Sequence, residues 1–506
     1  MALTDKLSAI GSAIREKTGG TELLTLDAMP AEIASITTSG GDENANAFED
    51  WKLSGVYNGE DGYIMDYYEN SRITKLVDSA MSGMAIRKVS LPNVETVGSS
   101  AFENMSYLTK ISAPKVMSLP TNAFRSAGTS EKPFTLDMPL VTSVDSYAFQ
   151  NAQVGQVILP SVTYIGGQCF YGCQSMDVLD CPENTNYLVS ECISYCSNLR
   201  VCNLPKTTEL GWAGMSQCSS IQALNFPALT SISSSQNLQG FESLKRLDLG
   251  QCQTISSQIA SNCSALHTLV LRYDGVCSLG ADASSWFSST KLPTTGYIYV
   301  PAAQVENYKV ATNWASVADR FRAIEDYLTE TTFGVITSVD LDASNYLANE
   351  GIVGISLDVT SLDATLFKDC ANLYYANLPS LTVLDDRAFY GCSSLKVVKM
   401  PKVTSIGYMA FRDCSNLGVL DLPATLSNVD SSAFSQIRYN VSTDIILRRT
   451  TKVTAGGPVA DNGYYAYAKP RLFVPAALVD SYKADSNWAN YFAEILPIEG
   501  SDYEEV

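Results

Sequence analysis

The chain has 506 residues, with 53 acidic and 34 basic side chains and a formal net charge of −19. This length exceeds that of one ordinary compact domain and predicts several domains or an array of repeats. The acidic balance argues against a nucleic-acid partner, and a single histidine, His267, excludes most histidine-dependent catalysis and multi-histidine metal sites.

Residues 1–41 are predicted to form a short helical segment that ends in a flexible glycine linker. Leu3, Leu7, Ile10 and Ile14 recur every three to four positions and form a short apolar seam on one helix face. Because so short a helix is not stable alone, it must dock on another surface. We expect it to drive self-association, with a trimer favoured, or attachment to a larger particle. Packing on its own chain is the alternative.

The beginning of the chain carries acidic and polar side chains where a signal peptide has a basic start and an apolar run. No stretch reaches the roughly 20 apolar residues of a membrane span. The sequence therefore predicts neither membrane insertion nor export by the ordinary secretory route.

Residues 42–290 are predicted to hold an N-terminal cap, over Trp51–Tyr68, and a first array of repeats. In the array an apolar residue precedes proline at intervals of roughly 21 to 25 residues, a period typical of repeat architectures. These prolines are Pro92, Pro114, Pro139, Pro160, Pro182, Pro205 and Pro227. Phenylalanines recur between them, at Phe102, Phe124, Phe149 and Phe170.

Residues 331–470 are predicted to form a second array, in which the repeat is cleaner. The phrase Phe389-Tyr-Gly-Cys392-Ser-Ser-Leu395-Lys-Val-Val398-Lys-Met400-Pro401 has counterparts that begin at Phe367 and Phe411, at the same distance on either side. Leu-x-x-Leu-x-Leu at such a period is the signature of a leucine-rich-repeat solenoid with one short parallel strand per turn.

Residues 291–330 and 471–506 duplicate one another and are predicted to cap the two arrays. Val300-Pro301-Ala-Ala matches Val474-Pro475-Ala-Ala, and Trp314 matches Trp488 at the same offset. The pattern indicates a final strand followed by an amphipathic helix, with the tryptophan as a buried apolar side chain. A cap would cover a solenoid end that could otherwise pair with another chain.

Seven of the 13 cysteines share one repeat position, shortly after the phenylalanine or its equivalent. Two interpretations are a metal or disulfide ladder and a column of small buried thiols. We favour buried thiols, because the chain has no Cys-x-x-Cys pair. The seven are Cys173, Cys196, Cys218, Cys263, Cys370, Cys392 and Cys414.

The Ala-Phe-x-x-Cys-x-x-Leu phrase closely resembles the BspA-like leucine-rich repeat family, over residues 70–290 and 350–435. The resemblance implies an α/β-type solenoid: two capped arrays with parallel strand ladders, here preceded by the N-terminal helical segment. This family occurs in surface adhesins and in phage or prophage tail proteins, and the resemblance implies recognition while leaving the target open. The sequence carries no catalytic motif, so we expect a protein without cofactors or enzymatic activity, with a cell-wall glycan hydrolase, which needs only two carboxylates, as a remote alternative.

The segment from Leu7 to Ile33 resembles the N-terminal segment of tail-associated proteins of phages and prophages of Gram-positive bacteria. We therefore expect a tail fibre or receptor-binding protein, assembled into a virion in the host cytoplasm. Its N-terminus would join a tail or baseplate protein, and its arrays would contact a bacterial surface glycan or protein. The alternative is a bacterial surface adhesin of the BspA-like type.

The outward strand positions of each array are the expected binding face, because a repeat sheet offers them as one extended surface. Adjacent tyrosines and lysines would suit a sugar or an anionic wall polymer. A solvated strand face without a ligand is the alternative. The expected residues are Tyr374, Tyr375, Asn377, Lys396 and Lys399 on the second array, and Lys245, Arg246 and Arg272 on the first.

Deletion of residues 1–41 tests the predicted association segment. We expect the truncated chain to fold as a monomer, because the apolar seam that joins the copies has been removed. Light scattering on the full-length and truncated chains measures the two masses. Equal masses would contradict self-association and leave only docking on a different protein.

Overall fold

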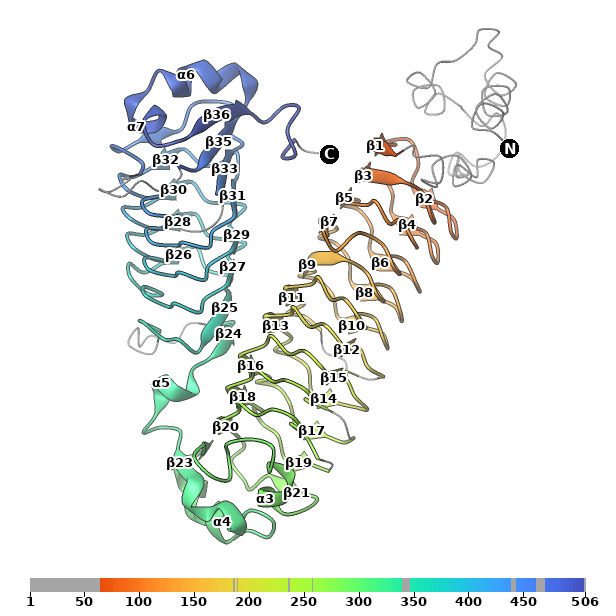
Figure 1. Ribbon diagram of the computed structural model, residues 1–506, viewed down its shortest axis with the longest axis vertical. Coiled ribbons are helices and arrows are strands. Elements are labelled where there is room, and N and C mark those ends of the chain that lie inside the picture. Colours follow the sequence, from red (N-terminus) through yellow and green to blue (C-terminus); the bar gives the residue numbers. More distant parts are fainter. Residues whose placement is uncertain are drawn as a thin grey trace.

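The computed structural model describes residues 64–504, apart from 185–186, 189, 235–236, 257, 339–345, 438–442 and 461–468. These residues form two solenoid arrays of short parallel strands that lie side by side, joined at one end (Figure 1). The expected α/β-type solenoid is corrected in one respect, because the fold is mostly sheet with little helix. The predicted helical segment, with Leu3, Leu7, Ile10 and Ile14, lies outside the described residues.

In the first array, a ladder of longer strands lies on the side toward the second array (Figure 1). It consists of two sheets. The first contains β1 (Met65–Glu69), β3 (Ile86–Ser90), β5 (Lys110–Ser112), β7 (Phe134–Asp137), β9 (Val154–Ile158), β11 (Val178–Asp180) and β13 (Val201–Asn203). The second contains β16 (Ala223–Asn225), β18 (Arg246–Asp248), β20 (Thr268–Val270), β22 (Tyr297–Val300) and β23 (Phe321–Ala323). Two-residue strands line another side of the turns: β2 (Lys75–Leu76), β4 (Thr96–Val97), β6 (Ser118–Leu119), β8 (Ser143–Val144), β10 (Tyr164–Ile165), β12 (Ile193–Ser194), β14 (Glu209–Leu210), β15 (Met215–Ser216), β17 (Ser231–Ile232), β19 (Thr254–Ile255) and β21 (Ser278–Leu279).

The second array repeats this plan with fewer turns. Its longer strands are β24 (Gly334–Ile336), β25 (Ile352–Ser356), β27 (Tyr375–Asn377), β29 (Val397–Lys399), β31 (Val419–Leu422), β33 (Asp444–Leu447), β35 (Arg471–Val474) and β36 (Glu494–Pro497). Its two-residue strands are β26 (Ser361–Leu362), β28 (Val383–Leu384), β30 (Ser405–Ile406), β32 (Asn428–Val429) and β34 (Thr454–Ala455).

The repeat period sets the strand register. Tyr375 pairs with Val397 in the longer ladder, and Val383 pairs with Ser405 in the two-residue ladder. Each of these pairs is separated by one period, so equivalent residues of successive turns lie side by side. The prediction of one strand per turn is incomplete, because the Leu381–Leu384 phrase forms a second, shorter strand, β28.

Aromatic rings and thiols fill the middle of each turn. Phe389 stacks on Phe411 with 5.7 Å between ring centroids, and both rings are fully buried. The thiol of Cys414 donates to the carbonyl oxygen of Phe389 in the preceding turn, at 3.1 Å. All seven cysteines of the repeat position make such a bond to the turn before, and all 13 cysteines are buried without disulfides. The prediction of buried thiols is confirmed.

Short helices lie near the end of each array, mostly between the last two strands of its longer ladder, β22 and β23 or β35 and β36. The first set is α3 (Ala283–Trp286), η2 (Ala302–Gln304), α4 (Val305–Val310), η3 (Ala315–Arg320) and α5 (Leu328–Thr331), and the second is η5 (Ala476–Leu478), α6 (Val479–Lys483) and α7 (Ser486–Ala489). Trp314 and Trp488 are fully buried beside them. The hydroxyls of Tyr308 and Tyr482 accept hydrogen bonds from equivalent backbone N–H groups of the last turns, so the duplicated sequence gives duplicated geometry.

Substitution of Phe411 tests how the turns depend on one another. Phe411→Ala should lower the free energy of unfolding by about 3–5 kcal/mol, because it leaves a cavity between Phe389 and Phe434. Adjoining turns should lose protection from hydrogen exchange as well, since each turn is stabilised by its neighbours. Tyr164→Ala, at an exposed aromatic position, is the control. A loss below about 1 kcal/mol for Phe411→Ala would contradict the assigned register.

Candidate functional site

The outward strand faces of the two arrays pack against each other, and we call this region the inter-array contact. Strands β24 and β25 of the second array lie against β13 of the first, and β24 also lies against β16. At Gly354, a Cβ atom would lie 3.1 Å from Val201 Cγ1, so the absence of a side chain allows the close approach. Buried apolar side chains from both arrays form one cluster here: Val178, Val201, Ala223, Val270, Tyr299, Ile324, Phe333, Val335, Val353, Tyr374, Tyr375 and Val397.

Asp180 of β11 is the polar centre of the inter-array contact. Its fully buried carboxylate accepts hydrogen bonds from the Tyr375 hydroxyl and the amides of Asn377 and Asn203. Burial raises the pKa of Asp180, although these hydrogen bonds oppose the rise. Because its pKa in the folded state lies above its unfolded value, this carboxyl contributes less stability as the pH rises through that interval.

Further polar contacts lie along the same seam. Tyr374 donates from its hydroxyl to Asp177 at 2.7 Å, and the Lys396 ammonium lies 2.9 Å from the same carboxylate. The amide side chain of Asn225 pairs with the backbone N–H and carbonyl of Val335, at 2.9 and 3.0 Å. The apolar cluster is thus bordered by hydrogen bonds that fix how the arrays dock.

This contact corrects the expectation of an open binding face. Tyr374, Tyr375 and Asn377 are buried against the first array, and Lys396 pairs with it. This part of the face is covered because strand positions that point out of one solenoid point into the other.

The remaining expected binding residues are not gathered on one surface. Lys399 is exposed, beyond the inter-array contact. Lys245 and Arg246 line a cavity beside that contact. Arg272 pairs with Asp248 at 2.7 Å and donates to the carbonyl of Thr331.

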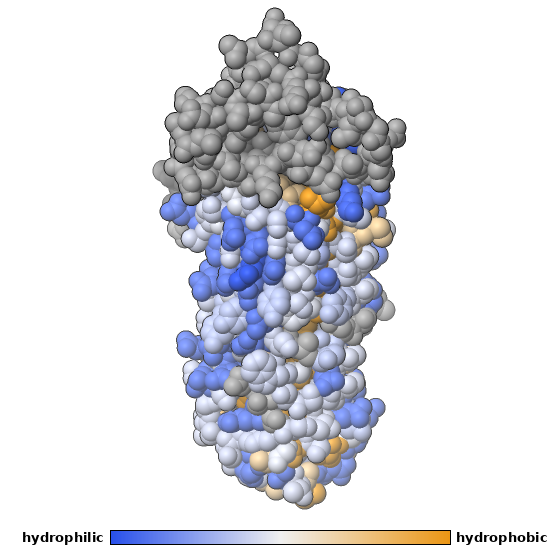
Figure 2. Space-filling model, turned by 90° about the vertical axis from the view of Figure 1, so that its right-hand side faces the viewer, coloured by the Kyte–Doolittle hydropathy of each residue, from blue (hydrophilic) through white to orange (hydrophobic). Residues whose placement is uncertain are grey.

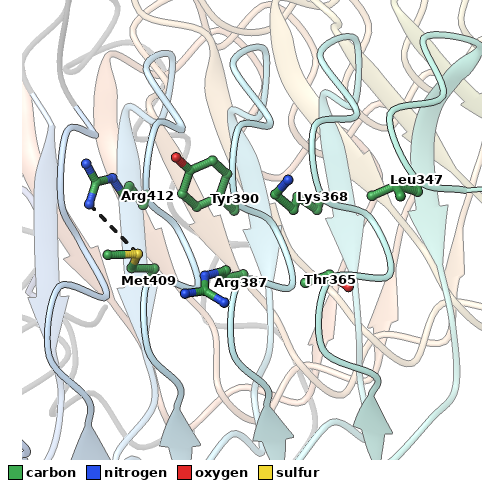
Figure 3. Close-up of a pocket in the computed structure, with 7 residues that line it drawn as sticks. All are labelled: Leu347, Thr365, Lys368, Arg387, Tyr390, Met409 and Arg412. Atoms are coloured by element: carbon green, nitrogen blue, oxygen red, sulfur yellow. Dashed lines mark hydrogen bonds between the residues drawn. The ribbon is translucent and has the colours of Figure 1, made fainter.

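A cluster of side chains that no other part of the described chain covers lies on another side of the second array, and we call it the second-array flank (Figure 3). It forms a shallow cavity of about 590 Å³. Its lining residues stand in two columns that follow the repeat, Thr365, Arg387 and Met409 in one and Leu347, Lys368, Tyr390 and Arg412 in the other.

The backbone conformation of each turn determines where these side chains lie. Thr365, Arg387 and Met409 precede the turn's inward apolar pair and have φ values of 68°, 55° and 55°, which belong to the left-handed region. Lys368, Tyr390 and Arg412 directly follow that pair. Because the two apolar residues between the columns are buried, the flanking residues are left at the surface.

The cations of the second-array flank are held by aromatic rings and carboxylates. The Lys368 ammonium lies 5.4 Å from the centre of the Tyr390 ring and 2.8 Å from Asp369. The Arg387 guanidinium lies 5.3 Å from the centre of the Tyr408 ring. Exposed ion pairs contribute little stability, so Lys368 can exchange Asp369 for an anionic ligand at small cost.

The equivalent flank of the first array has a different character. At the same positions it carries pairs such as Glu103 with Arg125 and Gln150 with Gln168. The three cations Lys368, Arg387 and Arg412 therefore lie close together on the second array, although the net charge of the chain is −19. The repeated spacing of Phe and Cys does not predict this site, because its signal lies in the varying residues on either side of Ala-Phe.

Within the described residues, no group of three or more His, Cys, Asp or Glu side chains could hold a metal ion. No helix among them is both long and apolar enough to cross a membrane. Figure 2 shows one side of the molecule, on which the coloured surface is mainly hydrophilic or intermediate and hydrophobic residues appear in small patches.

Sequence comparison agrees with the repeat geometry. The model of the BspA type leucine-rich repeat region matches residues 68–153, 142–267, 215–294 and 348–454, which is more than half of the chain. The chain belongs to the BspA-type leucine-rich repeat family. This assignment makes it a member of a solenoid family of binding and recognition proteins. No curated protein matches the chain.

Solved leucine-rich repeat proteins resemble this BspA-type chain only distantly. One from Bacteroides ovatus is 17% identical, with 84% of this chain and 87% of that chain covered and a TM-score of 0.35. A leucine-rich cell surface protein from Faecalibacterium prausnitzii is 15% identical, with 85% and 84% covered and a TM-score of 0.24. One from Eubacterium ventriosum is 14% identical, with 71% and 78% covered and a TM-score of 0.20.

Substitution of Asp180 tests the inter-array contact. Asp180→Ala removes the shared acceptor of Tyr375, Asn377 and Asn203, and each donor left unpaired costs about 1–3 kcal/mol. We expect a lower melting temperature and a larger radius of gyration in X-ray scattering, as the arrays separate. Asp137→Ala is the matched control, since Asp137 occupies the same repeat position but is exposed. Equal effects of the two substitutions would contradict the assigned role of Asp180.

Proposed function

We propose that this protein is a non-enzymatic adhesin that binds an anionic polymer of the bacterial cell surface through its second-array flank. The observation that carries the proposal is the cluster of Lys368, Arg387 and Arg412 with Tyr390 on an uncovered side of an acidic molecule. Part of the outward strand face, on which a repeat protein commonly binds its ligand, is occupied by the inter-array contact.

The chemistry of the flank supports an extended anionic ligand. Its cations repeat along the solenoid at the spacing of the turns, which suits a polymer with regularly placed phosphates or carboxylates. Tyr390 adds a flat ring against which a sugar can pack. The cavity is shallow, which favours a chain lying across the flank over a small enclosed molecule.

A second candidate function is that of a phage or prophage tail fibre or receptor-binding protein. It is favoured by the resemblance of Leu7–Ile33 to the N-terminal segment of tail-associated proteins, a segment outside the described residues. Such a protein would use its N-terminus to join a tail or baseplate protein as an oligomer, and its arrays to contact the host. Fractionation of a producing culture separates the two functions, since an adhesin accompanies the cell envelope and a tail protein sediments with particles.

Binding to isolated bacterial cell walls tests the proposed ligand. The protein should bind walls that retain their anionic polymers, and binding should fall at least tenfold after those polymers are extracted. Lys368→Gln with Arg387→Gln should weaken binding by a similar factor, because the charge-assisted contacts are lost. Binding should also weaken as salt is raised.

Lys483→Gln is the control for this experiment, since Lys483 is an exposed cation on helix α6, away from the flank. A correctly folded double variant that binds walls as tightly as the original protein would overturn the proposal. An equal loss in the control would show that net charge alone governs binding, and would overturn it as well.

A further inference from the structure

A separate cationic cavity of about 390 Å³ lies beside the inter-array contact, and we call it the seam cavity. The first array contributes Lys245, Arg246, His267 and Lys291, and the second array contributes Glu350. Three permanent cations therefore face one carboxylate in a chain whose net charge is −19. The rest of its lining is Gln222, Ala223, Ala265, Val353 and Asn372.

The cations of the seam cavity have few partners on the protein. Lys245 donates to the Gln222 side-chain oxygen at 3.3 Å. Among the described residues, neither Arg246 nor Lys291 forms a salt bridge within 4.0 Å. Burial lowers the pKa of Arg246, against the opposing effect of Glu350 and Glu330. A half-buried guanidinium with incomplete pairing is a favourable partner for an incoming anion.

The protonation of His267 depends on the charge in the seam cavity. Burial lowers its pKa, and the positive charges of Arg246, Lys291 and Lys245 lower it further. Its Nδ1 atom lies 2.9 Å from the hydroxyl oxygen of Thr268, which holds the ring in place. The positive charges of the three cations therefore all act on the His267 imidazole. An anion bound among them would partly cancel this effect.

We propose that the seam cavity binds one acidic monosaccharide unit, with its carboxylate or phosphate held by Arg246, Lys245 and Lys291. The Asn372 amide donates one hydrogen bond to the backbone carbonyl of Glu350, and the Gln222 oxygen accepts one from Lys245. The remaining donors and acceptors of these two amides can pair with sugar hydroxyls. Ala223 and Val353 supply an apolar wall against which the ring can lie. The volume of about 390 Å³ falls within the range of small-ligand pockets.

Both arrays line the seam cavity, so its ligand would bind only while they are docked. The bound sugar would then stabilise the inter-array contact through linkage. This site is distinct from the second-array flank. Because the two proposals rest on different residues, an experiment that contradicts one does not contradict the other.

The single histidine of the chain provides the measurement. Nuclear magnetic resonance of the tag-free protein, labelled with ¹³C at the histidine Cε1 atom, yields one signal whose pH titration gives the pKa of His267. Glucuronate or glucose 6-phosphate should raise that pKa, because a bound anion favours the imidazolium form. Neutral glucose should leave it unchanged. If neither acidic sugar shifts the titration at millimolar concentration, the proposal is overturned.

Inorganic phosphate distinguishes a sugar site from a bare anion site. Glucose 6-phosphate should bind at least tenfold more tightly than inorganic phosphate, owing to the amide contacts with the sugar. Equal affinities would overturn the sugar assignment.

Substitutions locate the site. Arg246→Gln with Lys291→Gln should reduce the affinity for glucose 6-phosphate at least tenfold, whereas Lys402→Gln, an exposed cation elsewhere on the second array, should leave it unchanged. Unaltered binding in the double variant, or an equal loss in the control, would contradict the proposal.

Discussion

Hydrogen bonds join each turn of this protein to the turns on either side of it, and the rest of the structure depends on this constraint. The thiol of Cys414 reaches the carbonyl of Phe389, and strand register advances by one turn in each ladder. A change in one turn is therefore felt by the turns on either side of it. Near the end of each array, the buried Trp314 and Trp488 lie in the segment that joins the last two strands of the longer ladder, β22 to β23 and β35 to β36.

In the inter-array contact, outward strand positions pack against the other array instead of facing solvent. Residues at equivalent positions of the repeat differ according to what they meet, as Asp180 and Asp137 illustrate, the first buried under the second array and the second exposed. The repeat thus fixes where a side chain points, while the surface opposite it decides whether the side chain is buried or exposed.

Much of the fold follows from spacing in the sequence. The regular repeat period predicts the parallel ladder, and the shared positions of Phe389 and Cys392 predict burial, because a strictly repeated apolar residue has one place in the turn. The docking of the arrays is not predictable in this way. The partners Asp180 and Tyr375 are 195 residues apart, and no local pattern links them. The second-array flank was not predicted because its residues vary from turn to turn and leave no repeated pattern in the sequence.

The separation between contacting residues also has a consequence for folding. Contacts within an array join residues about one turn apart, whereas those of the inter-array contact, such as Lys396 with Asp177, span 219 residues. Local contacts close small loops and form rapidly, but distant ones must wait until the intervening chain is ordered. Each array can therefore form by propagation from turn to turn before the two meet. During synthesis, the strand face of the first array is complete and uncovered until the second array emerges to cover it.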